Sequence, residues 1–222
     1  MKNKTMNFFI RIISHLKKNN IVIVTGEGRG ETSETIFHLL KPYFSVKRFI
    51  EKMPNIFDIL KNGTLIIETD LGTARIIKQA TALAKFSQVP ILVVSHVGEI
   101  PVNSDLFAGE EEKTIEIKKL AQLIPSYGFL ILNFDDKTVR KIDDLMSLKS
   151  FTFGFQEDAD FRASDVHANH GTTFKINYKG SIIPIWQEKD SKKEHVYSAL
   201  AASCVGVALG LNFVEISEAL KK

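Results

Sequence analysis

The 222-residue chain has a single cysteine, Cys204, so no disulfide can form within it. The absence of disulfides fits a reducing compartment, and we expect a cytoplasmic protein. Cys204 lies in the apolar run 201–205, which predicts a buried structural thiol rather than an exposed nucleophile.

Long apolar runs and massed charge of one sign are also lacking. No stretch reaches the roughly 20 apolar residues of a transmembrane helix, so we expect no membrane span. The formal net charge of +3, with scattered lysines, does not indicate a nucleic-acid partner. Linkers, repeats and low-complexity segments are missing, which favours one domain over residues 20–222.

The first 19 residues have the pattern of an amphipathic helix. Phe8, Phe9, Ile12, Ile13 and Leu16 share one helical face and are surrounded by basic residues. Two interpretations are open. The helix packs on the domain, or it contacts an anionic membrane surface through residues 6–18.

Strand-like apolar runs alternate with helical patterns along the first two-thirds of the chain. The predicted strands are 21–24, 64–68, 90–94 and 129–133, and the predicted helices are 32–40, 73–86 and 110–124. Continuous apolar strands joined by helices predict an α/β fold with a mostly parallel, P-loop-type sheet and helices on both faces. A small β-rich C-terminal segment (151–155, 173–178, 181–185) precedes two terminal helices at 195–209 and 213–220.

The segment 21–33 has the frame of a phosphate-binding loop. A β-branched strand leads into Gly26, Gly28 and Gly30, and Thr32-Ser33 open the helical pattern. A Walker-type loop needs lysine where this chain has Glu31. A unit charge pair at about 4 Å is worth about 4 kcal/mol at an effective dielectric of about 20, so the exchange replaces attraction with repulsion. Either the loop has lost its nucleotide, or Arg29 points inward and substitutes for the lysine.

Polar residues also follow the other predicted strands, where ligands of parallel sheets bind. They are Thr25, Glu68, Ser95-His96 and the stretch from Asn133 to Asp136. Glu68 is either a magnesium ligand or a solvated acid, while Asn133, Asp135 and Asp136 favour a capping role. His167 and His170 lack further ligands for a zinc set and favour a loop. Trp186 favours core or edge packing, with an exposed protein contact as the alternative.

Taken in order, these motifs resemble the central ATP-binding domain of the Mur ligases. The closest likeness is to the branch that adds D-alanyl-D-alanine to a UDP-N-acetylmuramoyl peptide. The matching segments are the loop after the first strand, Glu68, 97–107 (VGEIPVNSDLF), 132–136 (LNFDD), 152–166, 196–202 and 210–220.

The resemblance implies an ATP- and Mg²⁺-dependent ligase that joins a carboxylate to an amine in peptidoglycan precursor synthesis. The nucleotide-binding positions it implies are Gly26, Gly28, Arg29, Gly30, Glu31, Thr32, Ser33, Asn133 and His195. Thr32 and Glu68 would contact the metal; no catalytic residue is assigned. The family's UDP-binding and closing domains find no counterpart in the chain, and a partner chain could supply them.

Departures from the family pattern fall at charged working positions. Glu31 replaces the loop lysine, Asn103 replaces a metal-binding histidine, and Ile117 falls where a carbamylated lysine is usual. Glu194-His195 and Ser198 replace the residues that face the adenine, and residues 41–64 are too short for the family's substrate loop. Because one missing electrostatic contact costs about 2.7–4 kcal/mol, these losses together predict an impaired enzyme.

Three hypotheses follow. The chain retains nucleotide binding and works as a ligase with a partner chain, or it is a non-catalytic pseudo-ligase that acts as a scaffold or regulator in cell-wall synthesis. A third and weaker hypothesis is an adenosyltransferase-like nucleotide-binding protein, since Gly26-x-Gly28-x-Gly30-x-Thr32 also resembles the loop of that family.

Overall fold

The computed structural model describes residues 18–70, 74–96, 111–143, 148–168, 171–187 and 193–221. The predicted N-terminal helix, the 97–107 motif with Asn103, and His170 lie outside these ranges. Within the described part of the chain, no helix is long and apolar enough to cross a membrane.

One nine-stranded sheet runs through the described residues, in the order β2-β3-β1-β4-β5-β6-β7-β8-β9. The strands are β1 (Asn20–Thr25), β2 (Val46–Ile50), β3 (Thr64–Glu68), β4 (Pro90–Val94), β5 (Phe129–Asn133), β6 (Lys149–Gly154), β7 (Phe161–Ala168), β8 (Thr172–Tyr178) and β9 (Ser181–Gln187). From β2 to β7 in this order, β1 included, neighbouring strands pair in parallel. The pairs β7–β8 and β8–β9 are antiparallel. The predicted mostly parallel sheet with a β-rich C-terminal segment is confirmed.

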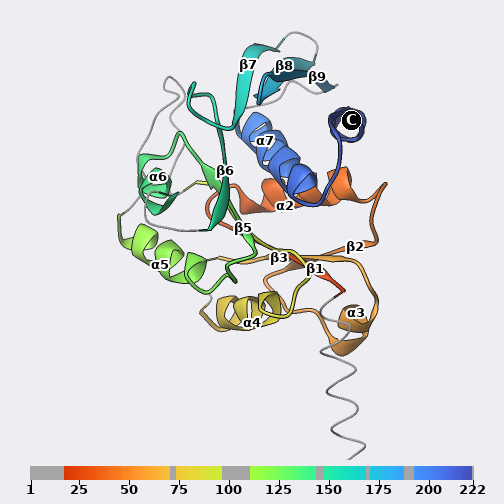
Figure 1. Cartoon of the computed structure of the whole chain (residues 1–222), viewed down its shortest axis with the longest axis vertical. Helices are drawn as coiled ribbons and strands as arrows, with labels where there is room; N and C mark the ends of the chain where they lie inside the picture. Colours follow the sequence, from red (N-terminus) through yellow and green to blue (C-terminus); the bar gives the residue numbers. More distant parts are fainter. Residues whose placement is uncertain are drawn as a thin grey trace, which may run out of the picture.

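Helices cover both faces of this sheet (Figure 1). They are α2 (Arg29–Leu40), α3 (Ile56–Leu60), α4 (Ala74–Ala84), α5 (Glu111–Ala121), α6 (Lys137–Asp143), α7 (Lys193–Ala208) and α8 (Phe213–Leu220). On one face, α2, α7 and α8 bury a core with alternate residues of β1 and β4, such as Val22 and Val93. On the other face, α4, α5 and α6 pack against the intervening residues, such as Ile23 and Leu92.

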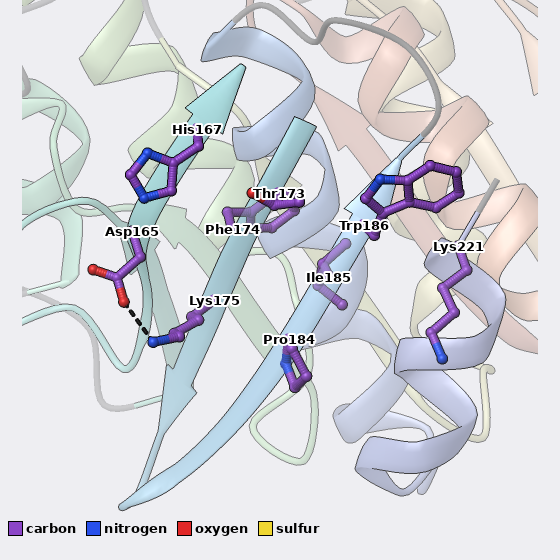
Figure 2. A pocket seen from close by; sticks show the side chains of 9 residues that line it. All are labelled: Asp165, His167, Thr173, Phe174, Lys175, Pro184, Ile185, Trp186 and Lys221. Atoms are coloured by element: carbon purple, nitrogen blue, oxygen red, sulfur yellow. Dashed lines mark ion pairs between the residues drawn. The ribbon is translucent and has the colours of Figure 1, made fainter. Parts of the chain in front are cut away.

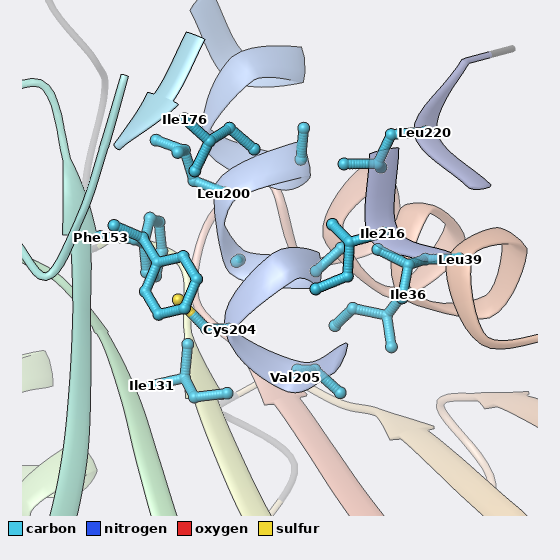
Figure 3. Packing of buried hydrophobic residues seen from close by; sticks show 14 of the residues in the cluster. Ile36, Leu39, Ile131, Phe153, Ile176, Leu200, Cys204, Val205, Ile216 and Leu220 are labelled. Atoms are coloured by element: carbon cyan, nitrogen blue, oxygen red, sulfur yellow. The ribbon is translucent and has the colours of Figure 1, made fainter. Parts of the chain in front are cut away.

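The first of these cores is centred on α7 (Figure 3). Cys204 lies in its middle, beside Phe153 and Ile131 of the sheet, and its side chain is fully buried. Burial raises the pKa of the Cys204 thiol well above its ordinary value, because the thiolate would lose its hydration. The predicted structural thiol is confirmed.

Four elements have no predicted range: β2, α3, β7 and α6, of which the first three have these local features. The edge strand β2 mixes charged residues with apolar ones and exposes Lys47 and Ile50, so it lacks the continuous apolar run of the inner strands. Helix α3 has only five residues and is held by an Asn55 capping box. Strand β7 is exposed over its second half and carries a bulge between Ser164 and His167.

Candidate functional site

The loop between β1 and α2 is shaped by two glycines with positive φ. Gly26 has φ 96° and Gly28 has φ 71°, and Gly28 is the N-cap of α2. A Cβ at Gly26 would lie 2.6 Å from the backbone oxygen of His96, and a Cβ at Gly28 would lie 2.8 Å from the Cε1 of the same histidine. The loop is therefore pressed against the end of β4 and requires glycine at both positions.

Helix α2 begins at Arg29 rather than at Thr32, because the left-handed Gly28 ends the turn and caps the helix directly. Gly30 and Glu31 are thus in the first helical turn, where backbone N–H groups without helical partners point out of the helix. Such N–H groups are the donors that bind phosphate at helix N-termini in other proteins, and phosphate binding by this loop stays a prediction.

Arg29 is held by acidic residues of the neighbouring strand ends. Its Nε lies 3.5 Å from Glu51 Oε1, and its Nη1 lies 3.7 Å from Asp70 Oδ1. The Nη1 also donates a hydrogen bond to the carbonyl oxygen of Gly26, at 3.3 Å. The charge of Arg29 is neutralised within the protein, so the geometry does not favour Arg29 as a substitute for the loop lysine.

Glu31 of α2 contacts His195 of α7, through its Oε1 and the Nδ1 of the imidazole. One residue on, the Thr32 hydroxyl lies 3.3 Å from the hydroxyl of Ser198, and both residues are buried. The resemblance assigns Glu31 and Thr32 to the phosphates and the metal, and it assigns the start of α7 to the adenine. In this chain, both residues instead contact side chains of α7.

Glu68 lies at the carboxyl end of β3 and is only 7% exposed. Its Oε2 accepts a 2.6 Å hydrogen bond from the Ser33 hydroxyl and lies 3.6 Å from Nε of Arg48. Arg48, on β2, also lies 3.3 Å from Glu34 Oε2. Sequence reasoning missed Arg48, because β2 itself gave no strand signal.

The polar residues after β5 act mainly on the backbone. Asn133 Oδ1 accepts from the N–H of Asp135, and Asp136 Oδ1 accepts from the N–H of Thr138, capping α6. Asp135 accepts from the N–H of Phe155 and from the Tyr197 hydroxyl, both at 2.7 Å, and joins β6 to α7. The expected capping contacts are present. Within the described residues, the buried Nδ2 of Asn133 has no hydrogen-bond partner.

His96 follows β4 and is nearly fully buried beside the loop. Burial lowers the pKa of His96 below its ordinary value, and the carboxylates of Asp136, Glu27 and Glu194 act in the opposite direction. Ser95 supports the same corner by donating to the carbonyl oxygen of Thr25, at 3.1 Å. The predicted convergence of polar strand ends is thus observed.

A separate groove of about 460 Å³ lies on the outer face of β7, β8 and β9 (Figure 2). Asp165 and Lys175 form a 2.7 Å ion pair there, and this contact lowers the pKa of Asp165. Trp186 is 47% exposed on the edge strand β9, so it is an edge residue and not a core residue. His167 lies on β7 and not in a loop, and the described residues contain no His, Cys, Asp and Glu cluster that could hold a metal.

The loop backbone and the charged side chains differ in how well they fit magnesium–ATP. The backbone turn is intact, but Glu31 stands in the first helical turn beside His195, where the resemblance requires a cation. The Thr32 hydroxyl is bonded to Ser198, and Arg48 neutralises Glu68. The side chains do not fit magnesium–ATP as the resemblance implies that it binds.

The described residues form a mostly parallel α/β sheet with a glycine turn after β1, and the sequence relatives that the chain matches include Mur ligases. Over 221 residues it is 25% identical to the UDP-N-acetylmuramate–L-alanine ligase of Caldicellulosiruptor bescii, covering 96% of this chain and 46% of the relative. Over 105 residues it is 37% identical to the same enzyme of Persephonella marina, covering 46% of this chain and 21% of the relative. The chain spans about half the length of its relatives, or less. No protein-family model matches it.

Solved Mur ligase structures share the fold. MurF from Acinetobacter baumannii superposes with a TM-score of 0.75 at 15% identity, covering 96% of this chain and 47% of the other. MurF from Thermotoga maritima, solved in complex with ADP, superposes with a TM-score of 0.65 at 18% identity, covering 93% of this chain and 50% of the other. The sequence relatives are L-alanine ligases whereas these structures are MurF, so the D-alanyl-D-alanine branch stays a prediction.

Proposed function

We propose that this chain is a Mur ligase-type ATP-binding domain whose phosphate loop no longer supports ligation. It serves as a non-catalytic pseudo-ligase, a scaffold or regulator beside peptidoglycan precursor synthesis in the cytoplasm. The contact between Glu31 and His195 carries the proposal. An acid paired with a histidine stands where catalysis of phosphoryl transfer needs a lysine on the phosphates.

Electrostatics support this proposal. At about 4 Å and an effective dielectric of about 20, a carboxylate repels each phosphate charge by about 4 kcal/mol. Arg29 does not compensate, because Glu51 and Asp70 already neutralise its charge.

Thermal melting with Mg-ATP tests the proposal. A ligand at 100 times its dissociation constant stabilises the folded state by about 2.7 kcal/mol, which is a shift of roughly 5–11 °C for a domain of this size. We expect millimolar Mg-ATP to leave the melting temperature of the wild-type chain unchanged. We expect Glu31→Lys to gain a shift of several degrees, because it restores the cation on an intact backbone.

Glu116→Lys is the matched control. It makes the same change of charge on an exposed position of α5, away from the loop, and should gain no shift. A Mg-ATP shift in the wild-type chain would overturn the proposal. If Mg-ATP changes the melting temperature of neither the wild-type chain nor Glu31→Lys, the loss of binding stands but its cause is not the charge at Glu31.

A ligase that works with a partner chain is the second candidate. It is favoured by the retained loop geometry and by the buried Asn133 amide, which has a donor to spare within the described residues. The same titration separates the two candidates, since only the ligase requires the wild-type chain to bind Mg-ATP. The sequence relatives support a link to ligases rather than the adenosyltransferase-like hypothesis.

A further inference from the structure

The carboxylate of Glu68 is buried at the carboxyl end of the sheet, where the resemblance places a metal. Glu68 ends β3 and is 7% exposed. A buried carboxylate is costly unless a positive charge or hydrogen-bond donors compensate for its lost hydration. The source of that compensation decides whether the position can serve a divalent cation.

The pairing of β2 with β3 places an arginine beside this carboxylate. Arg48 is the register partner of Ile66, two residues before Glu68 on the same face of β3. Its Nε lies 3.6 Å from Glu68 Oε2, and its side chain is only 20% exposed. The Ser33 hydroxyl completes the shell of this oxygen at 2.6 Å.

The adjacent acids at this end of the sheet are neutralised in the same way. Arg29 lies between Glu51 and Asp70, with nitrogen–oxygen distances of 3.5 and 3.7 Å. Arg48 also reaches Glu34 at 3.3 Å. Guanidinium groups of the chain thus face each of these carboxylates.

We infer that Arg48 takes the place of a divalent cation at Glu68, which makes this end of the sheet independent of metal. A dication at Glu68 would have to displace the guanidinium or bear its repulsion at short range. The inference rests on the ion pairs around Glu68 and not on the charge of the phosphate loop. It therefore stands or falls separately from the proposed loss of ATP binding.

Titration of the nucleotide-free chain with Mn²⁺, followed by the electron paramagnetic resonance signal of the free ion, tests the inference. We expect the wild-type chain to bind no Mn²⁺ at Glu68. We expect Arg48→Met to bind Mn²⁺ more tightly than the wild-type chain, because it leaves the Glu68 carboxylate buried without its cation. The added Glu68→Gln change should abolish that binding.

Arg162→Met is the matched control. Arg162 lies 3.6 Å from Glu157, whose side chain is 85% exposed, so removing this arginine should create no site. Wild-type binding of Mn²⁺ that Glu68→Gln removes would overturn the inference. So would a folded Arg48→Met chain that binds no more Mn²⁺ than the control.

If Arg48→Met does not fold, circular dichroism of the Arg48→Met/Glu68→Gln chain decides. Removing one partner of a buried ion pair is more damaging than removing both charges. A folded double variant would support the assigned pairing, and an unfolded one would contradict it.

Discussion

Charged side chains at the carboxyl ends of β1, β2 and β3 contact partners of opposite charge inside the chain. Arg29 contacts Glu51 and Asp70, Arg48 contacts Glu68, and Glu31 contacts His195. At the scale of single residues, each of these charged side chains thus faces a group of the chain itself that can carry the opposite charge.

His96 makes the stability of this corner depend on pH. Burial depresses the pKa of His96 in the folded state, against the opposing influence of Asp136, Glu27 and Glu194. The unfolded chain takes up a proton below about pH 6.5, its ordinary pKa, and the folded chain resists doing so. Stability should therefore be insensitive to His96 above that pH and fall as the pH drops towards the folded-state pKa.

Urea unfolding at pH 7.5 and 5.5 measures this effect. We expect His96→Gln to lose less stability than the wild-type chain between the two values, since glutamine takes up no proton. His167→Gln, at an exposed position of β7, should keep the wild-type dependence. Equal losses in the wild-type chain and His96→Gln would refute this role of His96.

Helix α7 connects the layers, since its buried residues face β5, β6 and α2 in one core. Gly206 allows the close approach of α2 and α8. A Cβ at this position would lie 3.2 Å from Leu39 Cδ2 and 3.3 Å from Ile216 Cδ1. This tight packing holds the N-terminal turns of α2 and α7 in the register that lets Glu31 contact His195.

Gly206→Val should overpack this junction and destabilise the fold by about 1–3 kcal/mol. Urea unfolding measures the loss, and labelling of the single, buried Cys204 with a thiol reagent should become faster as the layer opens more often. Ala82→Val places valine at an exposed position of α4 and controls for helix propensity. If the Gly206→Val chain is as stable as this control, the junction of α2, α7 and α8 is not tightly packed at Gly206 and the prediction is wrong.

The inner elements of the fold could be predicted from sequence because each has a local signal. The continuous apolar runs of β1, β3, β4 and β5 marked strands buried on both faces, and their boundaries were correct to about one residue. Strand β2 lies at the edge and mixes apolar with charged residues, so its position follows from pairing with β3 rather than from its own composition.

The candidate site could be predicted only in part, for the same reason. Gly26, Gly28 and the acid at Glu31 were evident because they are adjacent in sequence. The partners of these residues were not, since Glu31 meets His195 and Glu68 meets Arg48 only after the sheet has brought distant segments together. Local sequence patterns located the loop. The partners of its charged side chains are set by tertiary packing, which a local pattern does not reveal.

At the scale of the whole molecule, the chain has the fold of solved Mur ligases, and Glu31 stands where the resemblance expects a lysine. The match to solved Mur ligases covers nearly all of this chain and about half of theirs. The two cores and the glycine turn make up this shared architecture. The positions that depart from the family pattern are those that the resemblance assigns to phosphates, metal or base.

A crystal structure after soaking in a millimolar, non-hydrolysable Mg-ATP analogue tests this account most directly. The account predicts no triphosphate on residues 26–33, with Glu31 still in contact with His195 and Arg48 still beside Glu68. A triphosphate seated on the loop, with Arg29 turned from Glu51 and Asp70 to bind it, would contradict the account.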